Sequence, residues 1–333
     1  MLFCLGIIVW LARIKALIKY VPVLILLLAA SEMYRFAWKN TPFSPLKFVF
    51  PANPIIDYLT SRPKPFRIAG GIPTNLFMPY SIASAEGYDP LYPRLSGQWL
   101  SAADGGDVNI PTRRYGLLHN FSSPLLNYAN IEYVVNFKKG PAGDINKDGK
   151  FNAELLTPRF EQVSSFGRVA VFKNLDSLPR VYLTTDYVIE KDPVKIVEFL
   201  TKKNYLAVLE KEITGIKQNV DFTSQVLSYN QLPNEVLVTA RSSEAAVMVL
   251  SESYYPGWHA FIDGMETEIY KTNLAYKSIV FPKGVHKIEF IYQPKSFKIG
   301  KAVSLFVLIL LSAILLHERF RKKRAKASRT GSS

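Results

Sequence analysis

Two long apolar segments, one near each end, dominate the hydropathy pattern of the chain. The C-terminal segment, Ile299 to Leu316, is 18 residues long and holds a single charge, Lys301, near its start. A helix rises about 1.5 Å per residue, so this segment would cover roughly 27 Å, enough to cross a hydrocarbon core if Lys301 extends to the surface. A buried core helix is the alternative, but the segment has no polar face. The pattern therefore predicts a transmembrane helix over residues 299–317.

A second apolar run, Ala16 to Ala30, follows Arg13 and Lys15. Because basic residues collect on the cytoplasmic side of membrane spans, we expect this run to begin in the cytoplasm and to end outside. A cleaved signal peptide is the competing interpretation, since the run ends in small residues. Against it, Met1 to Ala12 is a further apolar stretch, too short to span by itself, that looks like the end of an earlier helix. Residues 1–31 are therefore predicted to hold a truncated helix and a transmembrane helix.

Between these segments the pattern changes near residue 215. Short helices and strands alternate before it, and Asp192-Pro193, for example, has the signature of a helix start. After it, short strands are separated by turns such as Asp263-Gly264, a strong hairpin signal. The expected strands are Val220–Tyr229, Glu235–Arg241, Ala246–Tyr254, His259–Ile262, Thr267–Tyr270, Tyr276–Phe281 and His286–Tyr292. The expected fold class is an α+β extracytoplasmic domain over residues 32–213, followed by a small β-sandwich over residues 217–295, with transmembrane helices on both sides.

The basic residues of the chain gather at the two membrane flanks. Of the net charge of +14, residues 318–333 contribute +6 and residues 1–31 contribute +3, which leaves only +5 for the middle. So little charge excludes a groove that follows nucleic-acid phosphates. The run over residues 318–333 is instead expected to be a basic cytoplasmic tail. Both flanks then place the large middle section outside the cytoplasm, at the cell membrane.

The single cysteine, Cys4, lies in the first apolar stretch. A disulfide framework and a cysteine-based zinc site are therefore impossible, and the stability of the outer region must come from core burial. Cysteine-poor exported domains are common in bacteria, and we expect a bacterial protein.

Several stretches together resemble the YfhO-type family of bacterial membrane proteins, which are similar to glycosyltransferases of the polytopic C superfamily. These stretches are FPANPIIDYL (Phe50 to Leu59), GYDPLYPRL (Gly87 to Leu95), SPLLNYANIEYVV (Ser123 to Val135), VAVFKNLDSLPRVYL (Val169 to Leu183) and the run from Tyr254 to Gly300. The resemblance implies transfer of a sugar from a polyprenyl-phosphate carrier, with an extracytoplasmic carboxylate as base and often a divalent ion.

The chain departs from that family in its membrane segments. The related enzymes carry many transmembrane helices and place their catalytic acid in an early outer loop. By this resemblance the catalytic loop is absent, so no catalytic residue is assigned and the chain alone is expected to be inactive. A truncated gene product and an anchored domain that works beside a polytopic membrane partner both remain open.

The candidate substrate-binding residues lie in two of the resembling stretches. Tyr88, Asp89 and Arg94 belong to GYDPLYPRL, where an aspartate before proline by default caps a turn. Trp258 and His259 belong to an aromatic cluster around a Pro-Gly turn, and aromatic faces can stack on sugar rings. The alternative for these two residues is that they close the end of a sandwich core or lie at the membrane interface.

A polar stretch resembles a calcium loop. Alternate oxygen-bearing side chains, with a glycine at the sixth position, suit the geometry of that ion. The candidate ligands are Asp144, Asn146, Asp148, Asn152 and Glu154. The twelfth position, where a bidentate carboxylate belongs, is Leu155, with Glu154 one place early. A polar hairpin without metal is the alternative, and calcium is the only cofactor that the sequence suggests.

These patterns favour the C-terminal extracytoplasmic region of a YfhO-like membrane glycosyltransferase, active in cell-envelope glycan or lipid-linked sugar transfer. The expected partners are the lipid bilayer, a polyprenyl-phosphate sugar or an envelope polymer. The alternative is a non-catalytic, membrane-anchored glycan-binding or scaffold module.

Overall fold

The computed structural model describes residues 18–40, 45, 48, 50–51, 53–70, 74–88, 91, 93–112, 115–219 and 221–330. Two features predicted above, the stretch Met1 to Ala12 and the candidate Asp89, lie outside these described residues. The chain divides into two units, Met1–Asn53 and Pro54–Ser333.

The first unit contains a long helix, α2 (Val21–Asn40), after a 3-10 turn, η1 (Ile18–Tyr20). Its proline, Pro22, lies in the first turn, where no backbone N–H is needed. None of its side chains is buried, and the helix is long and apolar enough to cross a membrane. It continues past the predicted apolar run and adds Tyr34 and Trp38, whose rings stack with centroids 6.0 Å apart.

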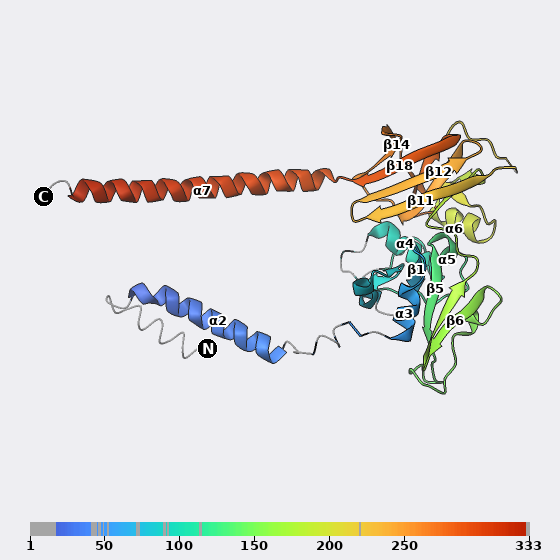
Figure 1. The fold of residues 1–333 in the computed structure, drawn as a ribbon, viewed down its shortest axis with the longest axis horizontal. Helices are drawn as coiled ribbons and strands as arrows, with labels where there is room; N and C mark the ends of the chain where they lie inside the picture. Colours follow the sequence, from blue (N-terminus) through green and yellow to red (C-terminus); the bar gives the residue numbers. More distant parts are fainter. Residues whose placement is uncertain are drawn as a thin grey trace. The chain divides into compact units, whose positions relative to one another are not determined.

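The second unit contains a five-stranded sheet in the order β2-β1-β5-β7-β6. Figure 1 labels β1, β5 and β6 of this sheet. The bounds are β1 Arg67–Ala69, β2 Ala83–Ser84, β5 Ile131–Phe137, β6 Phe160–Phe166 and β7 Val169–Asn174. Strand β1 is parallel to both of its neighbours, whereas β5, β7 and β6 are antiparallel. Strands β6 and β7 form a hairpin across Phe166-Gly167.

Helices cover both faces of this sheet. On one face, α3 (Pro54–Thr60) buries Ile55 and Leu59 in a cluster with Tyr133 and Val135 of β5. On the other, α4 (Arg94–Ala103) and α5 (Leu125–Tyr128) share a cluster with Ile131 and Val134 of β5. Burial on both faces explains why β5 is an almost continuous apolar run.

Short elements complete this region. They are η3 (Thr74–Tyr80), η4 (Ala153–Leu155), and the pair β3 (Gly87–Tyr88) and β4 (Tyr115–Gly116), which are antiparallel.

A six-stranded second sheet has the order β8-β13-β17-β16-β10-β9. Its bounds are β8 Val181–Thr184, β9 Tyr187–Ile189, β10 Ala207–Leu209, β13 Ala246–Ser253, β16 Tyr270–Thr272 and β17 Tyr276–Phe281. Helix α6 (Pro193–Thr201) connects the parallel strands β9 and β10, and the Asp192 side chain caps it by accepting from the backbone N–H of Val194 and Lys195 at 2.8 and 3.1 Å.

This second sheet draws strands from both sides of the domain boundary expected at residues 213–217. Strand β8 precedes that boundary and pairs along its length with β13, which follows it. Tyr276 of β17 also packs in the same cluster as Trp99 of α4, with ring centroids 6.1 Å apart. The change in sequence pattern near residue 215 therefore falls inside one sheet and does not separate two cores.

The third sheet is fully antiparallel, in the order β11-β12-β18-β14-β15. Its bounds are β11 Ser224–Leu232, β12 Glu235–Ser242, β14 Trp258–Ile262, β15 Met265–Thr267 and β18 Gly284–Tyr292. One buried cluster joins the second and third sheets, with Met248 and Phe281 from one and Val238 and Phe290 from the other. The single strand expected over Thr267–Tyr270 is wrong, because β15 ends in the third sheet and β16 starts in the second, so the chain crosses between the sheets at this point.

Helix α7 (Lys295–Thr330) follows β18 after a short link and runs for 36 residues. Its first part, Lys295–Glu318, is long and apolar enough to cross a membrane, and none of that window is buried. The predicted span over residues 299–317 lies inside it, and the basic run continues the same helix. The fold thus combines mixed helices and strands in several sheets with an apolar helix toward each end.

Candidate functional site

The turn YYPGW joins β13 to β14. Within it, Gly257 has a φ of +104°, a conformation that side-chain-bearing residues rarely adopt. The backbone N–H of Tyr254 donates to the carbonyl of Ala275 at 2.7 Å, and that of Gln293 donates to the carbonyl of Gly257, also at 2.7 Å. The turn is therefore fixed on one side to the residues before β17 and on the other to the residues before α7.

A pocket of about 250 Å³ lies beside this turn. Its wall combines aromatic rings with a few charged groups, the usual composition of a small-molecule site. The residues that give it this character are Tyr254, Tyr255, Trp258, His259, Glu266 and Lys277. We call it the aromatic pocket.

Trp258 lies between the aromatic pocket and the core. Its indole is partly buried and packs against the cluster that joins the second and third sheets. The ring also contacts Tyr292 of the neighbouring strand β18, with centroids 5.3 Å apart. One side chain thus closes the core at this end and lines the pocket.

Lys277 is fully buried beneath Trp258. Side chains alternate along β17, which places Lys277 on the same face as Ile279 and Phe281, toward the core between the two sheets. Its Nζ lies 3.2 Å from the centroid of the Trp258 ring, and within the described part of the chain it has no hydrogen-bond partner. Burial lowers the pKa of Lys277 to about 7, while the nearby Glu252 carboxylate opposes that shift.

The sequence analysis did not identify Lys277 as a functional candidate. A signal was available, because in YKSIVF the lysine occupies the same alternating set as an isoleucine and a phenylalanine. A charged residue at an inward position of a strand is uncommon unless it is paired or has a role.

His259 and Glu266 form the polar, more exposed part of the pocket. The His259 Nδ1 lies 2.8 Å from a Glu266 carboxylate oxygen, and the two side chains are 40% and 62% exposed. Such a pair presents the remaining imidazole nitrogen and carboxylate oxygen as hydrogen-bonding groups for a ligand. Together the pocket offers aromatic faces, a polar pair and a buried amine.

The other substrate-binding candidates do not line the aromatic pocket. Tyr88 is in β3, where its ring contacts that of Tyr115 at 4.8 Å, and Arg94 is the exposed first residue of α4. The hydroxyl of Ser96 in α4 lies 3.2 Å from that of Ser253 at the end of β13, the strand that leads into the aromatic turn.

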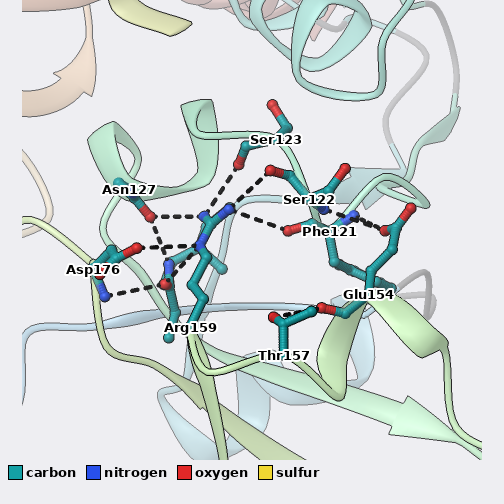
Figure 2. Close-up of polar contacts among 10 residues, drawn as sticks. Phe121, Ser122, Ser123, Asn127, Glu154, Thr157, Arg159 and Asp176 are labelled. Carbon is teal, nitrogen blue, oxygen red and sulfur yellow. Dashed lines mark hydrogen bonds and ion pairs between the residues drawn. The ribbon is translucent and has the colours of Figure 1, made fainter. Parts of the chain in front are cut away.

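Two of the calcium candidates, Asn152 and Glu154, form hydrogen bonds with backbone groups. Figure 2 shows the Glu154 carboxylate turned toward the backbone of the preceding loop, where it accepts from the N–H of Phe121 at 2.6 Å and of Ser122 at 3.2 Å. The Asn152 side chain accepts from the N–H of Glu154 at 2.9 Å and so caps η4. Across the described residues, no group of three His, Cys, Asp or Glu side chains is placed to hold a metal ion.

The remaining candidates lie in the exposed hairpin between β5 and η4. The side chain of Asn146 accepts from the N–H of Asp148 at 3.1 Å, a local turn contact. Asp144 and Asp148 are both exposed. This arrangement is that of a polar hairpin, and calcium binding stays a prediction.

Arg159 supplies the counterpart of the Glu154 contacts. Its guanidinium donates to the carbonyls of Ser122 and Ser123 at 3.0 and 3.1 Å and to the side chain of Asn127 at 2.8 Å (Figure 2). The Glu154 carboxylate thus binds backbone N–H groups of this loop, and the Arg159 guanidinium binds its carbonyl groups. The cluster is internally satisfied, which indicates a structural role.

Comparison with known proteins supports the resemblance seen in the sequence. Residues 200–304 match the family model described as bacterial membrane protein YfhO. No curated protein and no solved structure gives a match. The matched segment contains every residue of the aromatic pocket and the start of α7. The match and the two apolar helices support a membrane protein that associates with the lipid bilayer.

Proposed function

We propose that this chain is the C-terminal region of a YfhO-like membrane glycosyltransferase, and that its aromatic pocket contacts a sugar during transfer to a cell-envelope glycan or lipid. The observation that carries the proposal is the pocket itself, which lies wholly inside the segment that matches the family. The sugar would arrive on a polyprenyl-phosphate carrier or as part of an envelope polymer, with a polytopic membrane partner supplying the catalytic groups.

The lining of the pocket suits a sugar ring. Tyr255 is 51% exposed and Trp258 is partly buried, so both can offer a ring face to the apolar C–H surface of a pyranose. The His259–Glu266 pair can bond the hydroxyl groups at the edge of the same ring. Aromatic stacking and edge hydrogen bonds together would fix the orientation of the sugar.

The position of the pocket in the chain supports a site close to the membrane surface. Gly257 contacts Gln293 and Pro294, directly before the apolar window Lys295–Glu318. If that window spans the bilayer with its basic end in the cytoplasm, the pocket lies at the outer surface. We further infer that the second and third sheets form a β-sandwich, since they share one buried cluster.

A non-catalytic glycan-binding module is the second candidate. Glu266 is the only carboxylate among the described residues that line the aromatic pocket, and it is paired with His259. Glycoside hydrolysis generally uses two carboxylates, one on each side of the bond that breaks. This composition favours sugar binding over catalysis at the pocket, both for the transferase region and for the glycan-binding module.

Saturation-transfer NMR on the full chain in nanodiscs tests the proposal, with glucose, galactose, N-acetylglucosamine and their short oligomers as ligands. We expect transfer to at least one sugar, lost in Tyr255→Ala and weakened in Trp258→Phe. The matched control is Phe166→Ala, an equally exposed aromatic residue of β6 in the first sheet. Transfer at the wild-type level in both Tyr255→Ala and Trp258→Phe would contradict the proposed pocket.

Adding a polyprenyl-phosphate sugar donor and an acceptor lipid to the same preparation separates the two candidates. We expect no turnover by this chain alone. Turnover that appears when a polytopic partner is added, and that Tyr255→Ala reduces, supports the transferase. Binding without turnover in either case supports the anchored module.

A further inference from the structure

Arg180 is a buried arginine whose hydrogen bonds are incomplete. It directly precedes β8, and its carbonyl is paired with the N–H of Ser251 at 3.0 Å, which fixes the backbone. Its side chain is only 3% exposed, yet Nε and Nη1 have no hydrogen-bond partner among the described residues. Arginine cannot lose its charge at physiological pH, so a buried guanidinium with unused donors is costly unless a ligand completes it.

The surroundings of Arg180 carry excess positive charge. Arg67 donates to the carbonyl of Ser251 at 2.6 Å and to a Glu252 carboxylate oxygen at 3.2 Å. The Nη1 of Arg180 forms an ion pair with the same Glu252 oxygen at 3.4 Å but is not aligned for a hydrogen bond. Two guanidinium groups thus share one carboxylate. Burial, and then repulsion by Arg67, lower the pKa of Arg180 to about 10.

A pocket of about 360 Å³ borders Arg180 where the segment before β1 meets strand β11. Its polar lining consists of cations and neutral groups, and none of its described lining residues is Asp or Glu. The polar members are Lys64, Ser81, Arg180, Tyr229, Asn230 and Gln231. A second pocket, of about 380 Å³, shares Pro65, Arg180 and Tyr229 with the first, so Arg180 lies at the boundary between the two spaces.

We propose that this pocket, which we call the Arg180 pocket, binds a phosphate group. The unused donors of Arg180 match phosphate oxygens in the paired geometry that guanidinium groups favour. Lys64, exposed at the edge of the pocket, adds a second positive charge, although its Nζ already donates to the carbonyl of Ser81. Asn230 and Gln231 are the neutral amides of the lining, and the Gln231 amide lies 3.5 Å from a Glu252 oxygen. Donors that converge from several directions suit a tetrahedral anion. Because Nε and Nη1 are covered in this structure, a phosphate reaches them only when a neighbouring side chain moves.

The Arg180 pocket is separate from the aromatic pocket and does not depend on the proposed sugar contact. The two share no described lining residue. A failure to bind sugar therefore leaves the phosphate proposal intact. A failure to bind phosphate likewise leaves the sugar proposal intact.

Thermal unfolding of the full chain in neutral detergent micelles tests the proposal, with inorganic phosphate and glycerol phosphate titrated at constant ionic strength against chloride and acetate. We expect phosphate, and not the other anions, to raise the unfolding midpoint with saturation. Arg180→Gln should weaken the apparent affinity by about tenfold or more, the effect of losing one charged, paired contact. Lys64→Gln should weaken it by a smaller factor.

The control variant is Lys147→Gln, an exposed lysine in the hairpin before η4. It should leave the phosphate response unchanged. If Arg180→Gln fails to fold, Lys64→Gln still tests the pocket, because Lys64 is exposed and its removal leaves the core intact. The absence of a saturable phosphate response would overturn the proposal, as would equal responses in wild type and in Lys64→Gln and Arg180→Gln.

Nanodiscs identify the source of the phosphate. If phosphatidylglycerol discs raise the midpoint relative to phosphatidylcholine discs and abolish the response to added phosphate, the pocket holds an anionic lipid headgroup. If added glycerol phosphate acts equally in both discs, the ligand is a water-soluble phosphoester. A loss of the phosphatidylglycerol effect in Lys64→Gln is expected in the first case only.

Discussion

Gly257 and Pro294 lie so close together that a methyl group on Gly257 would meet the Cα of Pro294 at 2.9 Å. This contact places the aromatic turn directly against the residue that precedes α7. Neither backbone can yield easily, because Gly257 also accepts a hydrogen bond from Gln293. The candidate membrane helix and the aromatic pocket are therefore mechanically connected through a position that only glycine fits.

Replacing Gly257 by alanine should destabilise the protein by about 1–3 kcal/mol, because the new side chain is strained at positive φ and collides with backbone atoms. The matched control is Gly264→Ala, which has a φ of +83° but no neighbouring atom within 4 Å of the added methyl group. Thermal unfolding in detergent should show a larger loss for Gly257→Ala than for Gly264→Ala. Equal losses would mean that the contact with Pro294 contributes nothing.

The buried Lys277 makes stability depend on pH. Its pKa falls from an ordinary value of 10.5 to about 7 on folding, so the unfolded chain binds more protons between these values. The stability of the protein therefore increases as pH rises from about 7 toward 10.5. Below pH 7 the full cost of burying the charged Lys277 amine applies. In Lys277→Met that contribution disappears, and the variant should gain less stability than wild type between pH 7 and pH 9.5.

Unfolding midpoints measured at both pH values check this expectation. The contributions of the other titrating groups cancel when the pH dependence of the variant is subtracted from that of wild type. Lys147→Met, a change at an exposed lysine, should retain the wild-type pH dependence. An identical pH dependence in Lys277→Met and wild type would show that Lys277 stays charged on folding. The Trp258 ring, 3.2 Å from Nζ, would then be the group that holds the charge.

Glu154 should act as a structural anchor that needs no calcium. Glu154→Gln keeps an acceptor but loses the charge that strengthens the bonds from Phe121 and Ser122, so we expect a loss of about 1–3 kcal/mol. The loss should be the same with calcium and with a chelator. Asp148→Asn, in the exposed hairpin, should be close to neutral in both conditions. A calcium-dependent stability that both variants abolish would instead establish the predicted calcium loop.

The sequence predicted elements well where local chemistry decides them. Asp192 caps α6 through its own side chain, and Asp263 and Gly264 both adopt positive φ in the tight β14–β15 turn. Sequence-based prediction failed where a strand pairs with a segment far away along the chain. Strands β9 and β10 were not predicted, because three residues carry too little periodicity. The pairing of β8 with β13, 69 positions apart at Val181 and Leu250, leaves no trace in the local pattern.

The candidate site was predicted in part for the same reason. Trp258 and His259 are conspicuous in a short aromatic turn, and both line the aromatic pocket. Glu266 completes it from β15, which pairs with β14, and Lys277 from β17 of the second sheet, which packs against the third. Neither relationship is visible in the local sequence. Tyr88 and Arg94 come from a motif in another part of the second unit. Arg180 follows a proline in an ordinary loop, and its charge becomes significant only once its burial is known.

The last prediction concerns membrane orientation. Basic residues follow the apolar window of α7 and precede that of α2, so we expect both ends in the cytoplasm and residues 32–298 outside. In a Cys4→Ser background, single cysteines at Ser165, which is exposed in β6, and at Ser328 report the two sides. In intact cells an impermeant thiol reagent should label Ser165→Cys and not Ser328→Cys, and permeabilised cells should label both. Labelling of Ser328→Cys alone in intact cells would invert the orientation and place the aromatic pocket in the cytoplasm, away from any envelope glycan.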